Sequence, residues 1–150
     1  MAHLESLARA HPHPPALISE LTRAAEACFR CVESCLACSD ACLAETQVGR
    51  LVQCIRLNLD CADICHATGA LLVRFGREQP QPLQAQLAAC AAACRLCAEE
   101  CQRHAEHHEH CRLCAEVCVA CEEACAAVMR AMRHAGEGHP GDGLQPAVPH

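Results

Sequence analysis

The spacing of the cysteines constrains the fold of this chain more than any other feature of its sequence. The chain has 150 residues and 17 cysteines, and nearly all successive cysteines within a segment are three or four residues apart. Such steps return a side chain to the same face of an α-helix, as the a and d positions of a heptad do. We therefore expect four helices that turn their cysteines toward one core. The four ladders are Cys28, Cys31, Cys35, Cys38 and Cys42; Cys54, Cys61 and Cys65; Cys90, Cys94, Cys97 and Cys101; and Cys111, Cys114, Cys118, Cys121 and Cys125.

The residues around the ladders favour an all-α fold, because Ala, Leu, Glu, Gln and Arg predominate and β-branched and aromatic residues are scarce. We expect helices at about 15–45, 50–74, 82–104 and 109–133, separated by Gly- and Pro-containing breaks and by a His-rich tip. Short connections predict an antiparallel up-down-up-down four-helix bundle over residues 15–135. Residues 1–14 form a His- and Pro-rich lead, and residues 136–150 a flexible Gly- and Pro-rich tail.

A cysteine content this high indicates either a disulfide scaffold or a metal site. The odd count excludes complete internal pairing, and the first twenty residues contain no uninterrupted apolar core of the kind that directs export. Disulfides persist in oxidising compartments. We therefore expect a cytoplasmic protein whose thiols are reduced and free to bind metal.

Composition also excludes several classes of function. The net charge is −6, with no block of basic residues and no basic–aromatic pattern, so no nucleic-acid partner is expected. No apolar run is long enough to span a membrane. No pair of cysteines stands out from the others as a redox motif, so we expect no enzymatic activity.

The two ends of the expected core differ. Mostly apolar residues continue the inward stripes at one end and predict an apolar plug. They are Leu17, Leu21, Ala24, Thr68 or Gly69, Leu72, Leu83, Leu87, Val128, Met129 and Met132. At the other end lie Cys42, Cys54, Cys101 and Cys111, followed by a cluster of histidines that suggests where metal is taken up. On the helical stripes, His104 and His108 follow Cys101 by three and seven residues, and His107 precedes Cys111 by four.

Asn58 fills the one gap in the second ladder, four residues after Cys54 and three before Cys61. Two interpretations remain open at this point. A core Asn can fix the register of packed helices, or its amide can lie beside bound metal.

The thiols and the charge balance favour copper(I). Soft thiolates select copper(I), zinc or iron–sulfur clusters. Zinc with four thiolates would leave about two negative charges per site in an apolar core. Copper(I) needs only two thiolates, and if each thiolate bridges two ions the core stays neutral at about one ion per cysteine. A packing role for cysteine alone is the less favoured interpretation, because cysteine fills a core poorly compared with leucine.

The ladders CFRCVESCLACSDAC, CIRLNLDCADIC, CAAACRLCAEEC and CRLCAEVCVACEEAC resemble those of the bacterial four-helix-bundle copper storage proteins, in particular their cytosolic branch. The resemblance covers about residues 15–135 and implies storage of copper(I), bound mainly by pairs of thiolates, in a homotetramer of bundles. It also implies further ligands at the open end, for which the matching residues are Asn58, His104, His108 and His110. A copper chaperone or acceptor protein is the partner that such a store implies.

Other functions remain as alternatives. A metallochaperone would bind one or two copper ions. An iron–sulfur or zinc protein would use the same thiols to bind a cluster or zinc instead of copper. The spacing Cys28-x2-Cys31-x3-Cys35-x2-Cys38 differs from a ferredoxin loop in its middle gap and in lacking a following proline.

Overall fold

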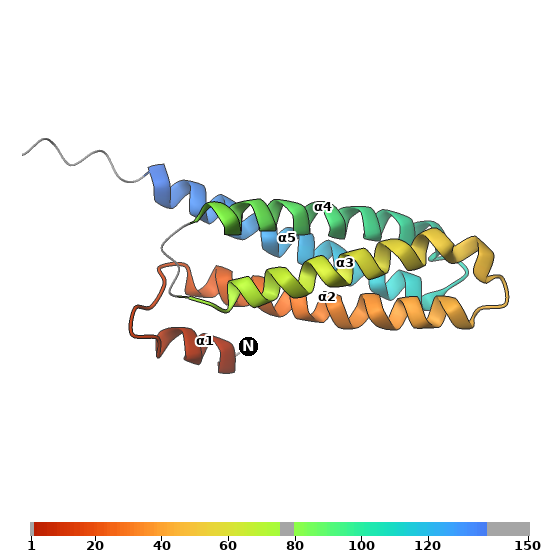
Figure 1. Cartoon of the computed structure of the whole chain (residues 1–150), viewed down its shortest axis with the longest axis horizontal. Coiled ribbons are helices and arrows are strands. Elements are labelled where there is room, and N and C mark those ends of the chain that lie inside the picture. The colour runs from red at the N-terminus through yellow and green to blue at the C-terminus, as the bar shows by residue number, and fades with distance from the viewer. Residues whose placement is uncertain (1, 76–79, 138–150) are drawn as a thin grey trace, which may run out of the picture.

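The computed structural model describes residues 2–75 and 80–137, which form helices and connecting segments only. The bundle consists of α2 (Ile18–Ala44), α3 (Val52–Leu72), α4 (Gln81–His104) and α5 (Glu109–Glu137). α2 packs against α3 and α5, and α4 packs against the same two helices. The chain passes along the bundle once in each of these helices and reverses direction between them (Figure 1), so the predicted antiparallel four-helix bundle is confirmed.

The ends of the helices lie close to those expected from sequence. α2 begins at Ile18 rather than Pro15, and α5 continues to Glu137 rather than ending near residue 133. Pro82 occupies the first turn of α4, where the missing N–H costs no hydrogen bond. The turn predicted at Gly49 is a 3-10 helix, η1 (Val48–Leu51). Residues 76–79 of the expected break and residues 138–150 of the expected tail lie outside the described residues.

A fifth helix, α1 (Ala2–Arg9), was not expected from the sequence; it lies within the lead and packs against α2. Ala8 is completely buried, and Leu4 packs against the core. Glu5 pairs with Arg9 one turn later at 2.6 Å. An apolar face on a segment of only eight residues is weak evidence for a helix, because short helices depend on tertiary packing for their stability.

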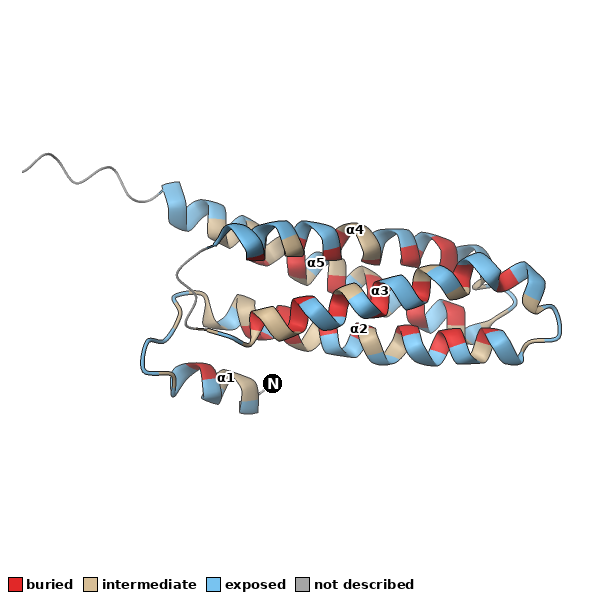
Figure 2. Ribbon diagram, in the orientation of Figure 1, coloured by how far each residue is buried: buried red, intermediate tan, exposed pale blue. Residues whose placement is uncertain are grey.

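Buried residues recur along each of the four bundle helices (Figure 2). Leu72, Leu83, Leu87 and Val128 are at most 4% exposed and form the apolar end that the sequence predicted. α2 and α3 approach closely at Gly69, where an added Cβ would lie only 3.0 Å from Cζ of Phe29. The middle of the core and the opposite end are occupied by thiols.

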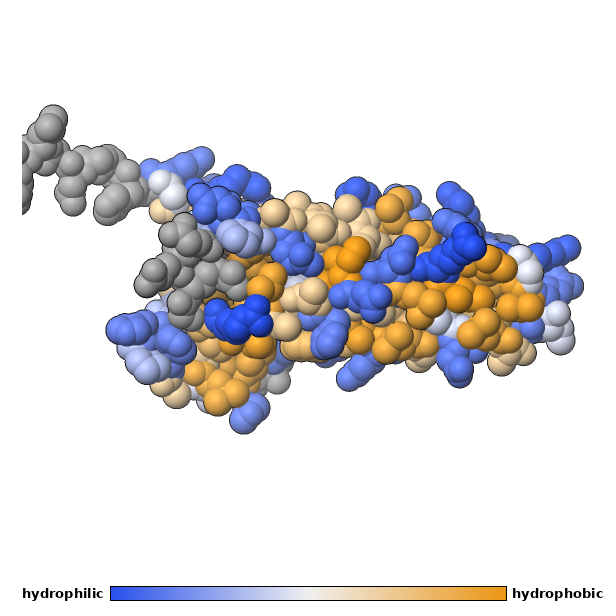
Figure 3. Space-filling model, viewed as in Figure 1, coloured by the Kyte–Doolittle hydropathy of each residue, from blue (hydrophilic) through white to orange (hydrophobic). Residues whose placement is uncertain are grey.

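Hydrophobic side chains also lie on the outside of the bundle. Leu36 and Leu43 on α2, and Val52 and Leu59 on α3, are between 44% and 61% exposed. Figure 3 shows the resulting apolar surface along these two helices. Even so, within residues 2–75 and 80–137 no helix combines the length and the hydrophobicity that crossing a membrane requires.

Candidate metal site

The bundle core is a column of reduced thiols. All 17 cysteines are free and buried, and none is more than 2% exposed. Neighbouring sulfurs lie within van der Waals contact, both along one helix, as for Cys31 and Cys35 at 3.8 Å, and between helices, as for Cys65 and Cys94 at 3.5 Å. The predicted inward orientation of every cysteine is therefore confirmed. It follows from the three- and four-residue steps, which keep each ladder on the buried face of its helix.

The thiols gather in groups of four that share members. Within each group all four sulfurs lie within 4.8 Å of one another, so one or more soft metal ions could be held without large movements. Four of the groups are linked by shared cysteines, namely Cys121, Cys31, and Cys35 with Cys118, so a thiolate of one group could bridge to an ion in the next. Five of these groups are Cys28, Cys90, Cys121 and Cys125; Cys31, Cys65, Cys94 and Cys121; Cys31, Cys35, Cys61 and Cys118; Cys35, Cys97, Cys114 and Cys118; and Cys38, Cys42, Cys54 and Cys111.

Asn58 lies inside this column and is completely buried. Its Oδ1 accepts hydrogen bonds from the thiols of Cys114 at 3.0 Å and Cys97 at 3.4 Å. Its Nδ2 donates to the backbone oxygen of Cys54 at 2.8 Å and lies 3.5 Å from Sγ of Cys101. Nδ2 also lies 3.3 Å from Sγ of Cys54 and 3.8 Å from Sγ of Cys38, so the amide contacts thiols of α2, α3, α4 and α5. Its oxygen occupies a place in the column that a thiol would otherwise fill.

His110 is the histidine that the structure brings to the thiols. Its Nδ1 lies 3.4 Å from Sγ of Cys38, 3.5 Å from Sγ of Cys111 and 4.0 Å from Sγ of Cys42. Its other ring nitrogen, Nε2, donates to Oε1 of Glu45 at 3.0 Å. The ring therefore lies between these three thiols and the surface at this end of the bundle.

His104, His107 and His108 lie farther out. They line a pocket of about 390 Å³ together with Glu45 and residues of the α2–α3 connection. Nδ1 of His108 donates to Oε1 of Glu45 at 3.0 Å, and Nε2 of His104 lies 3.1 Å from Oε1 of Glu100. In this structure His104 and His108 thus face carboxylates rather than thiols, and His107 is exposed.

Glu45 was missed by the sequence analysis. It is the C-terminal cap of α2 and lies three residues after Cys42, so it continues the ladder by one step. Hydrogen bonds from His110 and then His108 hold the pKa of this carboxyl below its usual value. Extending the periodicity past the last cysteine would have identified it.

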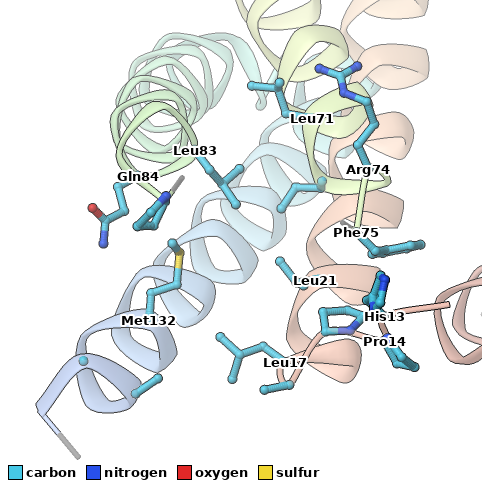
Figure 4. Close-up of a pocket in the computed structure, with 16 residues that line it drawn as sticks. His13, Pro14, Leu17, Leu21, Leu71, Arg74, Phe75, Leu83, Gln84 and Met132 are labelled. Atoms are coloured by element: carbon cyan, nitrogen blue, oxygen red, sulfur yellow. The ribbon is translucent and has the colours of Figure 1, made fainter. Parts of the chain in front are cut away.

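The opposite end differs in chemistry. A pocket of about 710 Å³ opens there, lined by apolar side chains such as Leu17, Leu21, Leu83 and Met132 (Figure 4). No cysteine is among the described residues that line it. The apolar residues expected to plug this end therefore surround a pocket rather than fill the space completely. The thioether of Met132 and the ring of His13 also line this pocket and are possible copper(I) donors, but no thiol of the described column continues from them.

Burial and the thiol neighbours control protonation in the column. Burial raises the pKa of the Cys42 thiol, and neighbouring thiols, Cys121 first, together with burial raise the pKa of Cys94. In contrast, hydrogen bonds from other thiols, Cys118 first, lower the pKa of Cys31. Burial opposes ionisation at all cysteines of the column whose pKa is shifted, and the pKa is raised at eleven of them and lowered at five. The thiols with a raised pKa keep their protons at neutral pH.

A four-helix bundle with a continuous column of free thiols belongs to the class of proteins that can hold many soft metal ions in one core. The comparison with known families agrees with this class. Residues 18–130 match the family model described as "Csp: Copper storage protein". The chain therefore belongs to the copper storage protein family.

Solved structures are similar over most of the chain. The copper storage protein Ccsp from Streptomyces lividans, loaded with 10 copper equivalents, is 43% identical, covers 85% of this chain and 98% of its own, and has a TM-score of 0.82. Cu(I)-bound BsCsp3 is 34% identical, covers 73% of this chain and 97% of its own, and has a TM-score of 0.65. An uncharacterized cysteine-rich protein of Bacillus subtilis is 38% identical over 103 residues, which are 69% of this chain and 90% of that protein.

The raised pKa values predict how the metal-free protein responds to alkali. The ordinary pKa of a cysteine thiol, which applies to the unfolded chain, is 9.0, and folding raises it at thiols such as Cys42 and Cys94. The contribution of these thiols to the free energy of unfolding is complete below pH 9.0. Above it the unfolded chain loses protons that the folded chain retains, so the free energy of unfolding falls as pH rises. The chain contains no Lys and no Tyr, so cysteine is the side chain that titrates in this range.

We therefore expect the thermal midpoint of the reduced apoprotein to fall between about pH 9 and about pH 11, as followed by circular dichroism. The copper-loaded protein should change much less, because its thiols have already lost their protons. A midpoint of the apoprotein that stays constant or rises over this range would contradict the protonated core.

Proposed function

We propose that this copper storage protein sequesters many copper(I) ions on the thiolates of its bundle core, at about one ion per cysteine. The observation that carries the proposal is the column of four-thiol groups that share members. A protein that carries one or two ions needs one such group. Groups that continue along the core suit a store.

The charges around the thiols favour copper(I) over zinc. Among the described residues the buried polar side chains are Thr22, Ser39, Asn58, Thr68 and Glu100, and no buried Arg or His is available to neutralise thiolates. The metal itself must therefore balance their charge. One copper(I) for each proton released achieves this balance, whereas zinc bound by four thiolates leaves a net negative charge.

We assign the ligand roles on the same grounds. The 17 cysteines would be the principal ligands, and Asn58 Oδ1 and His110 Nδ1, which lie close to thiols, would be neutral ligands. His104 and His108 are outer ligands, since they line the polar pocket rather than the column. We propose that copper(I) is taken up at this end, because Nδ1 of His110 lies beside the thiols of Cys38 and Cys111, whereas no cysteine is among the described residues that line the pocket at the other end.

We further propose that the bundle, residues 15–135, is the storage unit and acts in the cytoplasm without a catalytic role. The lead, residues 1–14, and the tail, residues 136–150, would lie outside that unit. One similar structure, 48% identical and covering 74% of this chain and 92% of its own, is of a cytosolic copper storage protein from Streptomyces lividans. A copper chaperone or acceptor protein would deliver or receive the ions.

The apolar outer face of α2 and α3 supports assembly into a homotetramer. Leu36 and Leu43 on α2 and Val52 and Leu59 on α3 leave a long apolar stripe exposed. Stripes of this kind are typical of surfaces that associate. A second copy of the bundle, which carries the same stripe, could cover it through a two-fold symmetric contact.

Titration of the reduced apoprotein with copper(I), in competition with a chelator of known affinity, tests storage directly. We expect saturation at about one ion per cysteine, close to the 17 thiols of the chain. Replacing the central Cys118 with Ala should lower the capacity, whereas H66A, a change at an exposed histidine, should leave it unaltered. Saturation at one or two ions would indicate a metallochaperone instead, and a brown protein with acid-labile sulfide would indicate an iron–sulfur cluster.

The assembly is tested by light scattering after size-exclusion chromatography. We expect the wild type to elute as a tetramer and the double variant L36E/L59E to elute as a smaller species, because two charges would then lie in the apolar stripe. L7E, at an exposed position of α1, serves as the control and should remain tetrameric. A wild-type monomer, or a tetramer unaffected by L36E/L59E, would rule out this face as the interface.

A further inference from the structure

One carboxylate oxygen connects two histidines of the polar end. Oε1 of Glu45 lies 3.0 Å from Nδ1 of His108 and 3.0 Å from Nε2 of His110. All three side chains are partly buried, with 34% of Glu45, 22% of His108 and 24% of His110 exposed. Glu45 lies at the C-terminus of α2, whereas His108 and His110 lie at the start of α5. The contact therefore depends on the assembled bundle.

This contact determines which ring nitrogens carry protons. An ionised carboxylate can only accept hydrogen bonds, so both nitrogens that face Glu45 must be protonated. In a neutral imidazole the second nitrogen then carries the lone pair. For His110 that second nitrogen is Nδ1, which lies 3.4 Å from Sγ of Cys38 and 3.5 Å from Sγ of Cys111.

We propose that Glu45 is a positioning residue for copper uptake, which holds His110 in the Nε2–H tautomer so that the Nδ1 lone pair faces the first thiols of the column. This inference deepens the proposed function, on which it rests. In the other tautomer Nδ1 would carry a hydrogen and could not accept a copper(I) ion. A carboxylate behind a metal-binding histidine is a recognised way to fix both the tautomer and the orientation of the ring.

The transfer that this geometry allows is balanced in charge. Copper(I) bound at Nδ1 of His110 moves to Sγ of Cys38, an S–Cu bond replaces the S–H bond, and the proton moves to the vacated Nδ1 and then to water. Copper stays in the +1 state, and the core gains one cation for each proton lost. His110 returns to its starting tautomer because Nε2 remains hydrogen-bonded to Glu45.

The test compares E45A with E106A, which removes a carboxylate from the exposed tip between α4 and α5 and so matches the change in charge. Two measurements are made on the full-length protein. Nitrogen-15 NMR of the reduced apoprotein reports the tautomer of His110, and stopped-flow mixing with a copper(I) complex reports the rate at which the first equivalents are taken up. The final copper capacity is recorded for each protein.

We expect wild type and E106A to show the Nε2–H tautomer of His110, and E45A to show a mixture with first uptake about tenfold slower. The capacity of E45A should equal that of wild type, since no thiol is altered. E45Q, whose amide oxygen can still accept a hydrogen bond from the ring, should show an intermediate tautomer population and an intermediate rate of first uptake. If E45A fails to fold, the same two measurements are made on E45Q.

Uptake by E45A within about twofold of wild type would overturn the inference, since loss of an orienting partner costs about tenfold or more. An unchanged tautomer in E45A would also overturn it, even if uptake were slower, because Glu45 would then act in another way. These outcomes differ from failure of storage itself, which would appear as a wild-type capacity of one or two ions.

Discussion

The structure depends on one electrostatic constraint: a core of buried thiols with no buried cation among the described residues must remain neutral. A single unpaired thiolate in such a core is costly, and many would be prohibitive. The metal-free protein meets the constraint by keeping most thiols protonated. The loaded protein meets it by replacing protons with copper(I) in equal number, which zinc in four-thiolate sites cannot do.

The same constraint explains why the two ends of the bundle differ. Ions that leave water for the column need ligands along the way, and the polar end provides His104, His108 and His110 ahead of the first thiols. At the other end Leu72, Leu87 and Val128 are fully buried and supply the hydrophobic stability that cysteines provide only weakly. Stability and metal uptake are thus assigned to opposite ends of one core.

The bundle and its cysteine lining could be predicted from sequence because helical periodicity is a local property, repeated here in four segments. α1 could not, since its stability comes from packing against α2. The spacing of the cysteines also could not predict that the ring of His110 lies against the thiols, because His110 is adjacent to Cys111 and so is off the three- and four-residue ladder. In the structure His110 lies in the first turn of α5, and its ring contacts Cys38. Glu45 illustrates an intermediate case, because the ladder points to it but only the fold shows that it binds two histidines.

The central claim is neutral exchange of protons for copper(I), and counting the protons released during loading tests it most directly. Copper(I) is added in steps to the reduced apoprotein in weak buffer, and the base needed to hold the pH constant is recorded. The account predicts about one proton released for each copper bound, from the first equivalent to saturation. Loading without proton release, or with a ratio that departs steadily from one, would show that the core accumulates charge and would contradict it.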